Sequence, residues 1–209
     1  MFYLKNCLFI YIIMSKTLYC IRHGLSLHNK LYHKHGSKTF YDKDYVDTML
    51  LPEGKRQARM LGETWNEINK IELVIVSPLK RTLETAVNIF DGFNIPIIAL
   101  EMCREFPMGL HTCNKRSNKE ELELLYPQVN FEDILSNKDD LWNDKKEESI
   151  DSLNSRITLV KEYIKNRPEK NIAFVNHAAF IGQMKDNHIK YLDNGDEELK
   201  HCFPYKLII

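Results

Sequence analysis

The residues best suited to chemistry each follow a short apolar run of sequence. The runs cover residues 18–21, 73–76 and 172–175. Arg22 and His23 come directly after the first run. Arg81 comes shortly after the second, and His177 comes shortly after the third. Short apolar runs are typical of buried strands. Open α/β sheets bind ligands at the carboxyl ends of their parallel strands, so these four side chains are expected to converge at one edge of a sheet.

Two arginines beside two histidines would form a site for an anion. A guanidinium group stays charged, and its planar fork matches phosphate oxygens. Nearby cations lower the pKa of an imidazole because like charge disfavours the imidazolium form. A neutral His23 beside Arg22 and Arg81 would therefore be a nucleophile toward an anion that the arginines hold. Arg22-His23-Gly24 is a weak motif by itself, because a histidine after a strand is often a simple polar end. Gly24 is expected to permit a tight turn beside the ligand.

Strands and helices alternate along the rest of the chain. The expected strands are residues 18–21, 73–76, 95–100, 172–175 and 205–209. The expected helices begin near residues 52, 82, 119 and 179, and Leu153, Ile157, Val160 and Ile164 mark a further helix that ends before Pro168. Residues 28–45 are expected to form a long loop over the site, and residues 128–148 an acidic insertion with its own small packing. The alternation predicts an α/β fold, a three-layer α/β/α sandwich with a mostly parallel central sheet.

Length, charge and cysteine content narrow the class of protein. A chain of 209 residues is most simply one domain, here residues 17–209. It has 29 basic and 29 acidic residues, so it lacks the basic excess expected of a nucleic-acid binder. Its five cysteines are odd in number and scattered, which argues against a disulfide scaffold or zinc finger and favours a reducing, cytoplasmic location. The sequence has no signature of oligomeric state.

The N-terminal residues 1–16 are expected to form an extension before the domain. Residues 7–14 are an apolar run of eight, too short to span a bilayer. The run could belong to a targeting signal, but only Lys5 precedes it and no small-residue cleavage site follows. The favoured interpretation is that translation begins at Met14.

Several motifs together resemble the histidine phosphatase superfamily, the phosphoglycerate mutase-like proteins. In chain order they are Arg22-His23-Gly24-x-Ser26-x-x-Asn29, Leu50-x-x-x-Gly54-x-x-Gln57-Ala58, Ser77-Pro78-Leu79-x-Arg81-Thr82-x-x-Thr85-Ala86, Arg104-Glu105 and Val175-Asn176-His177. Cys113-Asn114-Lys115-Arg116 and Tyr126-Pro127-Gln128-Val129-Asn130-Phe131 are similar to the eukaryotic mutase-like branch. The resemblance runs from about residue 17 to the C-terminus and implies the phosphoglycerate mutase-like fold.

The resemblance also implies a covalent mechanism. His23 would attack phosphorus and carry the phosphoryl group. Arg22, Arg81 and His177 would bind its oxygens, with His177 also counted as catalytic. Asn29 would donate a hydrogen bond to phosphate or substrate. No metal or other cofactor is expected, because the arginines supply the positive charge.

The resemblance implies that an acid near residue 105 serves the leaving group. Glu105 would protonate the leaving oxygen and then deprotonate the water that cleaves phosphohistidine. Glu101 is the alternative, since it lies one helical turn away. Glu105 is preferred because it follows Arg104 as the acid of the family follows its arginine.

Other polar residues have both plain and functional interpretations. Lys115 and Arg116 are either solvated or positioned to reach a second anionic group. His33 and His35 suggest a metal site, but no carboxylate or cysteine stands at ligand spacing, so none is expected. Residues 178–179 are both alanine where relatives commonly have a glycine in a small pair, which predicts a slightly tighter pocket.

Three functions are compatible with this resemblance. The preferred one is a phosphatase, a phosphoric monoester hydrolase acting on a small phosphorylated metabolite. Phosphoglycerate mutases of the superfamily carry Glu-Arg-His-Tyr-Gly around the acid, whereas this chain has Glu105-Phe106-Pro107-Met108-Gly109. That difference counts against the mutase. A non-catalytic phosphate-binding module would be expected to have lost a chemistry-bearing residue, and no such loss is visible.

Overall fold

The centre of the fold is a six-stranded sheet in the computed structural model, which describes residues 15–189 and 199–209. The strand order is β4-β3-β2-β5-β1-β6, and only β6 runs antiparallel to its neighbour. The strands are β1 (Thr17–Arg22), β2 (Leu73–Val76), β3 (Ile97–Ala99), β4 (Val129–Asn130), β5 (Asn171–Asn176) and β6 (Pro204–Ile208). The prediction of a mostly parallel sheet is confirmed.

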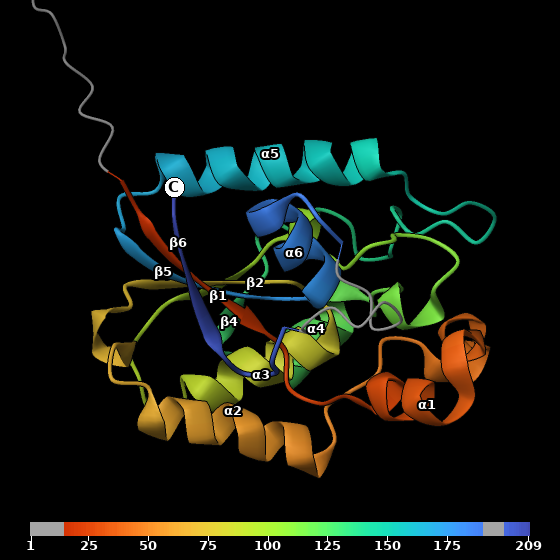
Figure 1. Cartoon of the computed structure of the whole chain (residues 1–209), viewed down its shortest axis with the longest axis horizontal. Helices are drawn as coiled ribbons and strands as arrows, with labels where there is room; N and C mark the ends of the chain where they lie inside the picture. Colours follow the sequence, from red (N-terminus) through yellow and green to blue (C-terminus); the bar gives the residue numbers. More distant parts are fainter. Residues whose placement is uncertain (1–14, 190–198) are drawn as a thin grey trace, which may run out of the picture.

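Helices cover both faces of this sheet. They are α1 (Leu27–His35), α2 (Pro52–Thr64), α3 (Lys80–Ile89), α4 (Lys119–Leu125), α5 (Ile150–Asn166) and α6 (Ala178–Asp186). Figure 1 shows α2 and α3 on one side of the strands and α5 and α6 on the other. The predicted three-layer α/β/α sandwich is therefore confirmed.

Alternation along β1 shows how the sequence builds the layers. Tyr19 and Ile21 belong to the apolar cluster that includes residues of α2 and α3. Leu18 and Cys20 belong to the other cluster, with residues of α5 and α6. Successive side chains of a strand point to opposite faces, so a continuous apolar run is what a strand buried on both faces requires.

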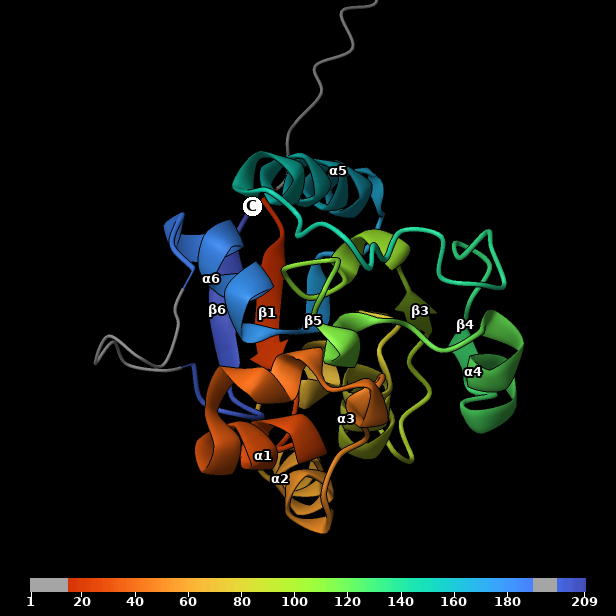
Figure 2. The ribbon, with the colours of Figure 1, turned by 90° about the vertical axis from the view of Figure 1, so that its right-hand side faces the viewer.

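The register brings the ends of three strands together. Arg22, the last residue of β1, pairs with Asn176, the last residue of β5. Val76 at the end of β2 pairs with Val175 of β5. The residues that follow these strands therefore emerge at one edge of the sheet, at the end of the molecule where α1 lies (Figure 2).

Residues 28–45 are not the long loop that was expected. They form most of α1 and two 3₁₀ helices, Gly36–Tyr41 and Lys43–Tyr45. α1 begins at a capping box: the backbone N–H of Ser26 donates to Oδ1 of Asn29 at 3.2 Å, and the Ser26 side chain caps the Asn29 backbone in return. This short helix has no broad apolar stripe, which is why periodicity did not indicate it.

Residues 128–148 do not form a small packing unit of their own. Val129, Phe131 and Ile134 belong to the main cluster on the α2–α3 side, and β4 extends the sheet beside β3. Asp139 and Glu148 from this stretch pair with buried arginines of other segments. These two acidic residues of the stretch therefore form ion pairs with Arg104 and Arg156, which lie elsewhere in the sequence.

The expectations for the N-terminal extension and for the cysteines have different outcomes. Residues 1–14, which hold most of the expected extension, lie outside the described residues. Within the described part, no helix is both long and apolar enough to cross a membrane. The four described cysteines are free, buried thiols: Cys20, Cys103, Cys113 and Cys202.

Candidate active site

His23 lines a cavity of about 110 Å³ at the carboxyl edge of the sheet. Its Nδ1 donates a hydrogen bond of 2.8 Å to the carbonyl oxygen of Gly24. That bond assigns the proton to Nδ1 and leaves Nε2 with its lone pair. The ring is 2% exposed, so its orientation is set by the surrounding protein. His23 therefore presents a nucleophilic nitrogen in a fixed tautomer.

Gly24 is needed for a close approach of two loops rather than for a tight turn. A Cβ built on Gly24 would lie 2.5 Å from the carbonyl oxygen of Gly54, at the start of α2. Its N–H donates to Oγ1 of Thr85 on α3 at 3.0 Å. A larger residue would push the loop that carries His23 away from both helices.

Arg22 and Arg81 line the same cavity as His23, as the strand ends predicted. Arg81, at the start of α3, is 1% exposed. Its Nη1 donates to the carbonyl oxygen of Cys113 at 2.7 Å, and its Nη2 donates to Oδ1 of Asn114 at 2.9 Å. Nη1 of Arg22 donates to the carbonyl oxygen of Leu199 at 2.8 Å. Arg81 is thus held by two acceptors that carry no net charge, and one end of the Arg22 guanidinium group is anchored at Leu199.

His177 is buried beside His23, with ring centroids 5.3 Å apart. Its Nε2 is hydrogen-bonded to Oγ of Ser77 at 2.8 Å. Its buried Nδ1 has no hydrogen-bond partner among the described residues. His177 contacts the nucleophile candidate but is not one of the residues that line the cavity.

Two further histidines, which the sequence analysis missed, surround His23. The His28 ring lies 6.0 Å from it and lines the cavity, and the His201 ring lies 5.6 Å from it. Nδ1 of His201 donates to the carbonyl oxygen of His23. His28 lies within the motif from Arg22 to Asn29, so its position could have indicated a place in the site. No local feature of the sequence around His201 indicates that it lies beside His23.

Burial and nearby positive charge lower the pKa values of His23, His28 and His177 and so favour their neutral forms. Desolvation is the largest cause that lowers the pKa of His23 well below its ordinary value, and the charges of Arg81, His177, His201 and Arg22 lower it further. Desolvation followed by Arg81 likewise lowers the pKa of His177. An imidazole that stays neutral keeps its lone pair available at acidic as well as neutral pH.

Glu105 is the carboxylate that lines the cavity. Its Oε1 accepts hydrogen bonds from the backbone N–H groups of Phe106 at 2.8 Å and Phe180 at 3.2 Å, the latter in the first turn of α6. Burial raises the pKa of Glu105, outweighing these hydrogen bonds and the charge of Arg81, which lower it. Glu101 lies elsewhere and pairs with Arg104 at 3.1 Å and Arg116 at 3.0 Å. The geometry therefore favours Glu105 as the acid.

Asn29 lines the cavity but uses its carbonyl oxygen within α1. Oδ1 accepts from the backbone N–H and hydroxyl of Ser26, at 3.2 and 2.6 Å. The amide nitrogen lies 3.3 Å from Nε2 of His28. The NH₂ group of Asn29 is therefore directed at His28, another residue that lines the cavity.

The remaining candidates from the sequence lie in different surroundings. Arg116 is buried, pairs with Glu101 and donates to the carbonyl oxygens of residues 136–138. Nζ of Lys115 lies 4.7 Å from the centre of the Trp142 ring. Neither residue lines the cavity. Residues 15–189 and 199–209 contain no group of three or more potential metal ligands, so His33 and His35 join no such cluster there.

The aromatic wall of the cavity was not predicted. It contains aromatic side chains from α1, the 3₁₀ helix Gly36–Tyr41 and the loop after β3: Tyr32, Phe40, Phe106 and His111. These segments are distant in sequence and have no shared pattern. The cavity thus combines an imidazole nucleophile, two cations and a protonatable carboxyl group with an aromatic wall, which is equipment for phosphoryl transfer.

Comparison with known proteins agrees with this arrangement. The family model described as histidine phosphatase superfamily (branch 1) matches residues 18–191. A phosphoglycerate mutase-like protein of Arabidopsis thaliana is 32% identical over 197 residues, covering 79% of this chain and 72% of the relative.

Solved structures share the fold. Bacillus stearothermophilus YhfR superposes with a TM-score of 0.57 at 20% identity, covering 92% of this chain and 89% of that one. The alpha-ribazole phosphatase of Shigella flexneri gives a TM-score of 0.55 at 19% identity, covering 80% and 77%. On its sequence motifs, its sheet and the extent of these matches, the chain belongs to the histidine phosphatase superfamily, branch 1.

Proposed function

We propose that this protein is a phosphatase that hydrolyses a small phosphomonoester through a phosphohistidine intermediate. The observation that carries the proposal is the tautomer of His23. Nδ1 donates its hydrogen bond to Gly24, which leaves the lone pair on Nε2, and His23 lines a cavity together with Arg22, Arg81 and Glu105. A non-catalytic binding module would need the cations but would not need an oriented, neutral imidazole or a protonatable carboxyl group.

The first step forms a bond between Nε2 of His23 and phosphorus and breaks the ester P–O bond. Arg22 and Arg81 hold the phosphoryl oxygens and stabilise the charge that develops on them. Glu105, in its protonated form, gives its proton to the leaving oxygen, so the alcohol departs neutral. His177, whose ring lies beside that of His23, would assist in holding the phosphoryl group.

The second step returns the enzyme to its starting state. Glu105, now a carboxylate, takes a proton from water, and the water oxygen bonds to phosphorus as the P–Nε2 bond breaks. Phosphate leaves, His23 is again neutral, and Glu105 is again protonated. Glu105 acts as an acid when the ester P–O bond breaks and as a base when the new P–O bond to water forms.

The protein is expected to hydrolyse a generic aryl phosphate with a maximum at mildly acidic to neutral pH. His23 must be unprotonated, and its pKa is lowered, so activity should persist on the acidic side. Glu105 must be protonated for the first step, and its pKa is raised, so activity should fall as pH rises through that pKa. Because arginines neutralise the phosphoryl group, a chelator should leave the rate unchanged. Rates that increase steadily into alkaline pH, or loss of activity with chelator, would contradict this mechanism.

The Glu105→Gln variant is expected to slow the release of poor leaving groups. Glutamine keeps the shape but cannot donate the carboxyl proton, so kcat/KM for an alkyl phosphate, which reports the first step, should fall about 100-fold. The kcat/KM for a p-nitrophenyl ester, which needs little protonation to leave, should fall much less. The alkaline limb of the pH profile should also disappear.

Glu101→Gln is the matched control for that variant. Glu101 pairs with Arg104 and Arg116 outside the cavity, so its replacement should affect stability more than leaving-group dependence. If Glu101→Gln shows the leaving-group effect and Glu105→Gln does not, Glu101 is the acid.

A phosphoglycerate mutase is the competing function, since the Arabidopsis relative carries mutase-like in its name. A phosphoglycerate has a carboxylate in addition to its phosphate. Lys115 and Arg116, the residues best placed in sequence to receive it, are engaged outside the cavity. Incubation with 3-phosphoglycerate and a bisphosphate primer is expected to release phosphate and to yield no 2-phosphoglycerate.

A further inference from the structure

Three of the four residues of the aromatic wall, Tyr32, Phe40 and His111, have stacked rings. The Tyr32 and Phe40 rings are nearly parallel, with centroids 5.0 Å apart and 12° between their planes. The Phe40 and His111 rings stack at 4.9 Å and 26°. All three residues line the same cavity as His23 and Arg81. The rings of Tyr32 and His111 cover the two faces of Phe40, so this ring meets the cavity with its edge.

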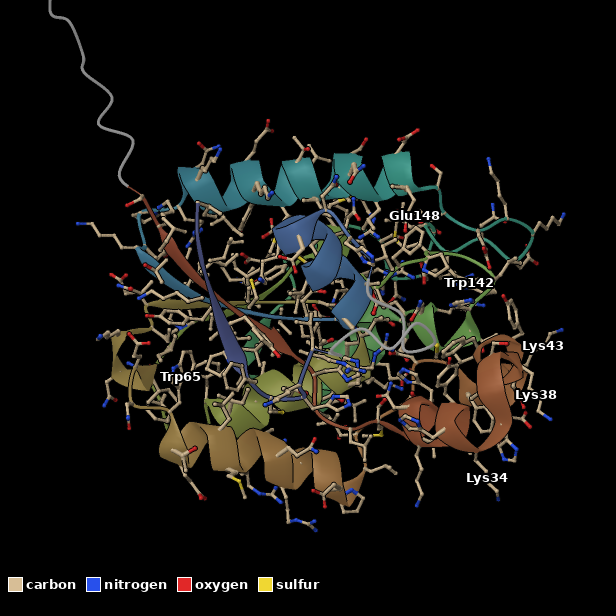
Figure 3. All side chains as sticks on the ribbon, in the orientation of Figure 1. Lys34, Lys38, Lys43, Trp65, Trp142 and Glu148 are labelled. Carbon is tan, nitrogen blue, oxygen red and sulfur yellow. The ribbon has the colours of Figure 1, made fainter. Side chains whose placement is uncertain are left out.

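Segments distant in sequence hold the aromatic wall in place. Oγ1 of Thr112 donates to the carbonyl oxygens of Phe40 and Asp42, at 3.1 and 2.6 Å. Nε1 of Trp142 donates to the carbonyl oxygen of His111 at 3.1 Å. Figure 3 shows Trp142 at the same end of the molecule as α1, whereas Trp65 lies at the opposite end. Hydrogen bonds from Thr112 and Trp142 thus fix the backbone that carries Phe40 and His111, so the wall is preorganised for a ligand.

The aromatic wall carries little charge. His111 is partly buried, and this burial lowers its pKa, so its ring is mainly neutral at pH 7. Neutral aromatic rings bind flat or apolar groups by edge-to-face contact and by removing apolar surface from water. They give no compensation for a buried carboxylate.

The cavity supplies cations only where the phosphate would sit. Within residues 15–189 and 199–209, the only guanidinium or ammonium groups that line it are those of Arg22 and Arg81. Lys34, Lys38 and Lys43 are exposed on the segment that carries the wall, and none of them lines the cavity (Figure 3). A substrate with a second anionic group would therefore find no further guanidinium or ammonium group among these lining residues to pair with it.

We propose that the preferred substrates are monophosphate esters of aromatic or otherwise flat, uncharged alcohols, with the alcohol portion against Tyr32, Phe40 and His111. This inference rests on the proposed phosphatase activity and adds the class of leaving alcohol. With phosphorus at His23 and the ester oxygen near Glu105, the group attached to that oxygen extends into a small cavity that these three rings line together with polar and small side chains. The wall thus selects the alcohol, and the arginines bind the part common to all phosphomonoesters.

The test compares benzyl phosphate, ethyl phosphate and 3-phosphoglycerate. All three release an aliphatic alcohol, so differences in kcat/KM report recognition more than leaving-group reactivity. The kcat/KM for benzyl phosphate is expected to exceed that for ethyl phosphate by about 10-fold, the scale of removing one aromatic ring from water. The kcat/KM for 3-phosphoglycerate should be no higher than that for ethyl phosphate. Equal kcat/KM for benzyl and ethyl phosphate, or preference for 3-phosphoglycerate, would overturn the inference.

The Phe40→Ala variant locates the preference at the wall. It should reduce the benzyl-to-ethyl ratio about fivefold or more while changing kcat/KM for ethyl phosphate about twofold or less. Phe40→Leu keeps apolar volume without the ring and should give an intermediate ratio. Phe203→Ala removes an exposed ring outside the cavity and should keep the ratio of the unmodified protein. An unchanged ratio in Phe40→Ala and Phe40→Leu would place the preference elsewhere and refute the assignment.

Failure of this inference is distinct from failure of the proposed function. If the protein hydrolyses these esters without preference and His23→Ala abolishes hydrolysis, the phosphatase stands and the inference is wrong. If no ester is hydrolysed, or hydrolysis survives in His23→Ala, the proposed function itself is wrong.

Discussion

Replacing His23 by alanine is expected to lower kcat/KM for every phosphomonoester by at least about 10⁴-fold, the scale seen when a catalytic nucleophile is removed. The variant has no nitrogen to bond to phosphorus, and the two cations would hold an ester that nothing attacks. Water in the vacated space lacks the fixed lone pair that the hydrogen bond from His23 Nδ1 to Gly24 provides. Steady-state rates with an aryl phosphate measure the loss.

Two further measurements make the His23 prediction specific. Rapid acid-free quenching with a ³²P-labelled ester should trap label on the unmodified protein and none on His23→Ala. His35→Ala replaces an exposed histidine at the end of α1 and should retain full activity. Thermal unfolding of His23→Ala checks that the buried site still folds. Substantial turnover or label in His23→Ala would remove His23 from the role of nucleophile.

The Arg81→Met variant is expected to lower kcat/KM by about 10³-fold, within the range for losing a charged donor to a transferring phosphoryl group. Methionine keeps an unbranched apolar stem but removes the charge and the planar fork. Arg81 is 1% exposed, and its two hydrogen-bond acceptors, in Cys113 and Asn114, are uncharged, so a bound phosphate would add to the counter-charge of Glu105 and Asp47. Both a higher KM and a lower kcat are expected.

The pH profile separates the charge of Arg81 from a structural role. Arg81 is the largest charge that lowers the pKa of His23. Its removal should raise that pKa, so the acidic limb of kcat/KM should move to higher pH. Arg81→Lys keeps the charge without the fork and should restore the limb while recovering only part of the rate. Arg59→Met, an exposed arginine on α2, should change neither. An unshifted acidic limb in active Arg81→Met would mean that this charge does not tune His23.

The strands and the strand-end residues could be predicted because their signals are local. Four consecutive apolar residues such as Leu73–Val76 fit a strand buried on both faces, and the polar residues that end such runs must emerge at the sheet edge. Parallel pairing then brings Arg22, Arg81 and His177 together regardless of their separation in sequence. Glu105 entered through the resemblance, because its loop has no periodicity of its own.

The regions that were misjudged lack such local signals. α1 begins at a capping box between Ser26 and Asn29, but its faces are mostly polar, so it looked like a loop. Residues 128–148 looked detached because they are acidic, yet Asp139 and Glu148 meet arginines that lie elsewhere in the sequence. An acidic side chain shows its partner only when both are placed in space.

The amino-acid sequence by itself determined the layered sheet and the identity of the groups at its carboxyl edge, because strand burial and parallel pairing follow from short apolar runs. Only the tertiary structure decided which ring nitrogen of His23 is free, that Arg116 is occupied elsewhere, and that Tyr32, Phe40 and His111 form one wall. The physical reason is that these properties depend on contacts between segments with no shared pattern. Tautomer, charge compensation and stacking each require a partner at a distance of a few ångströms, and no local pattern specifies that partner.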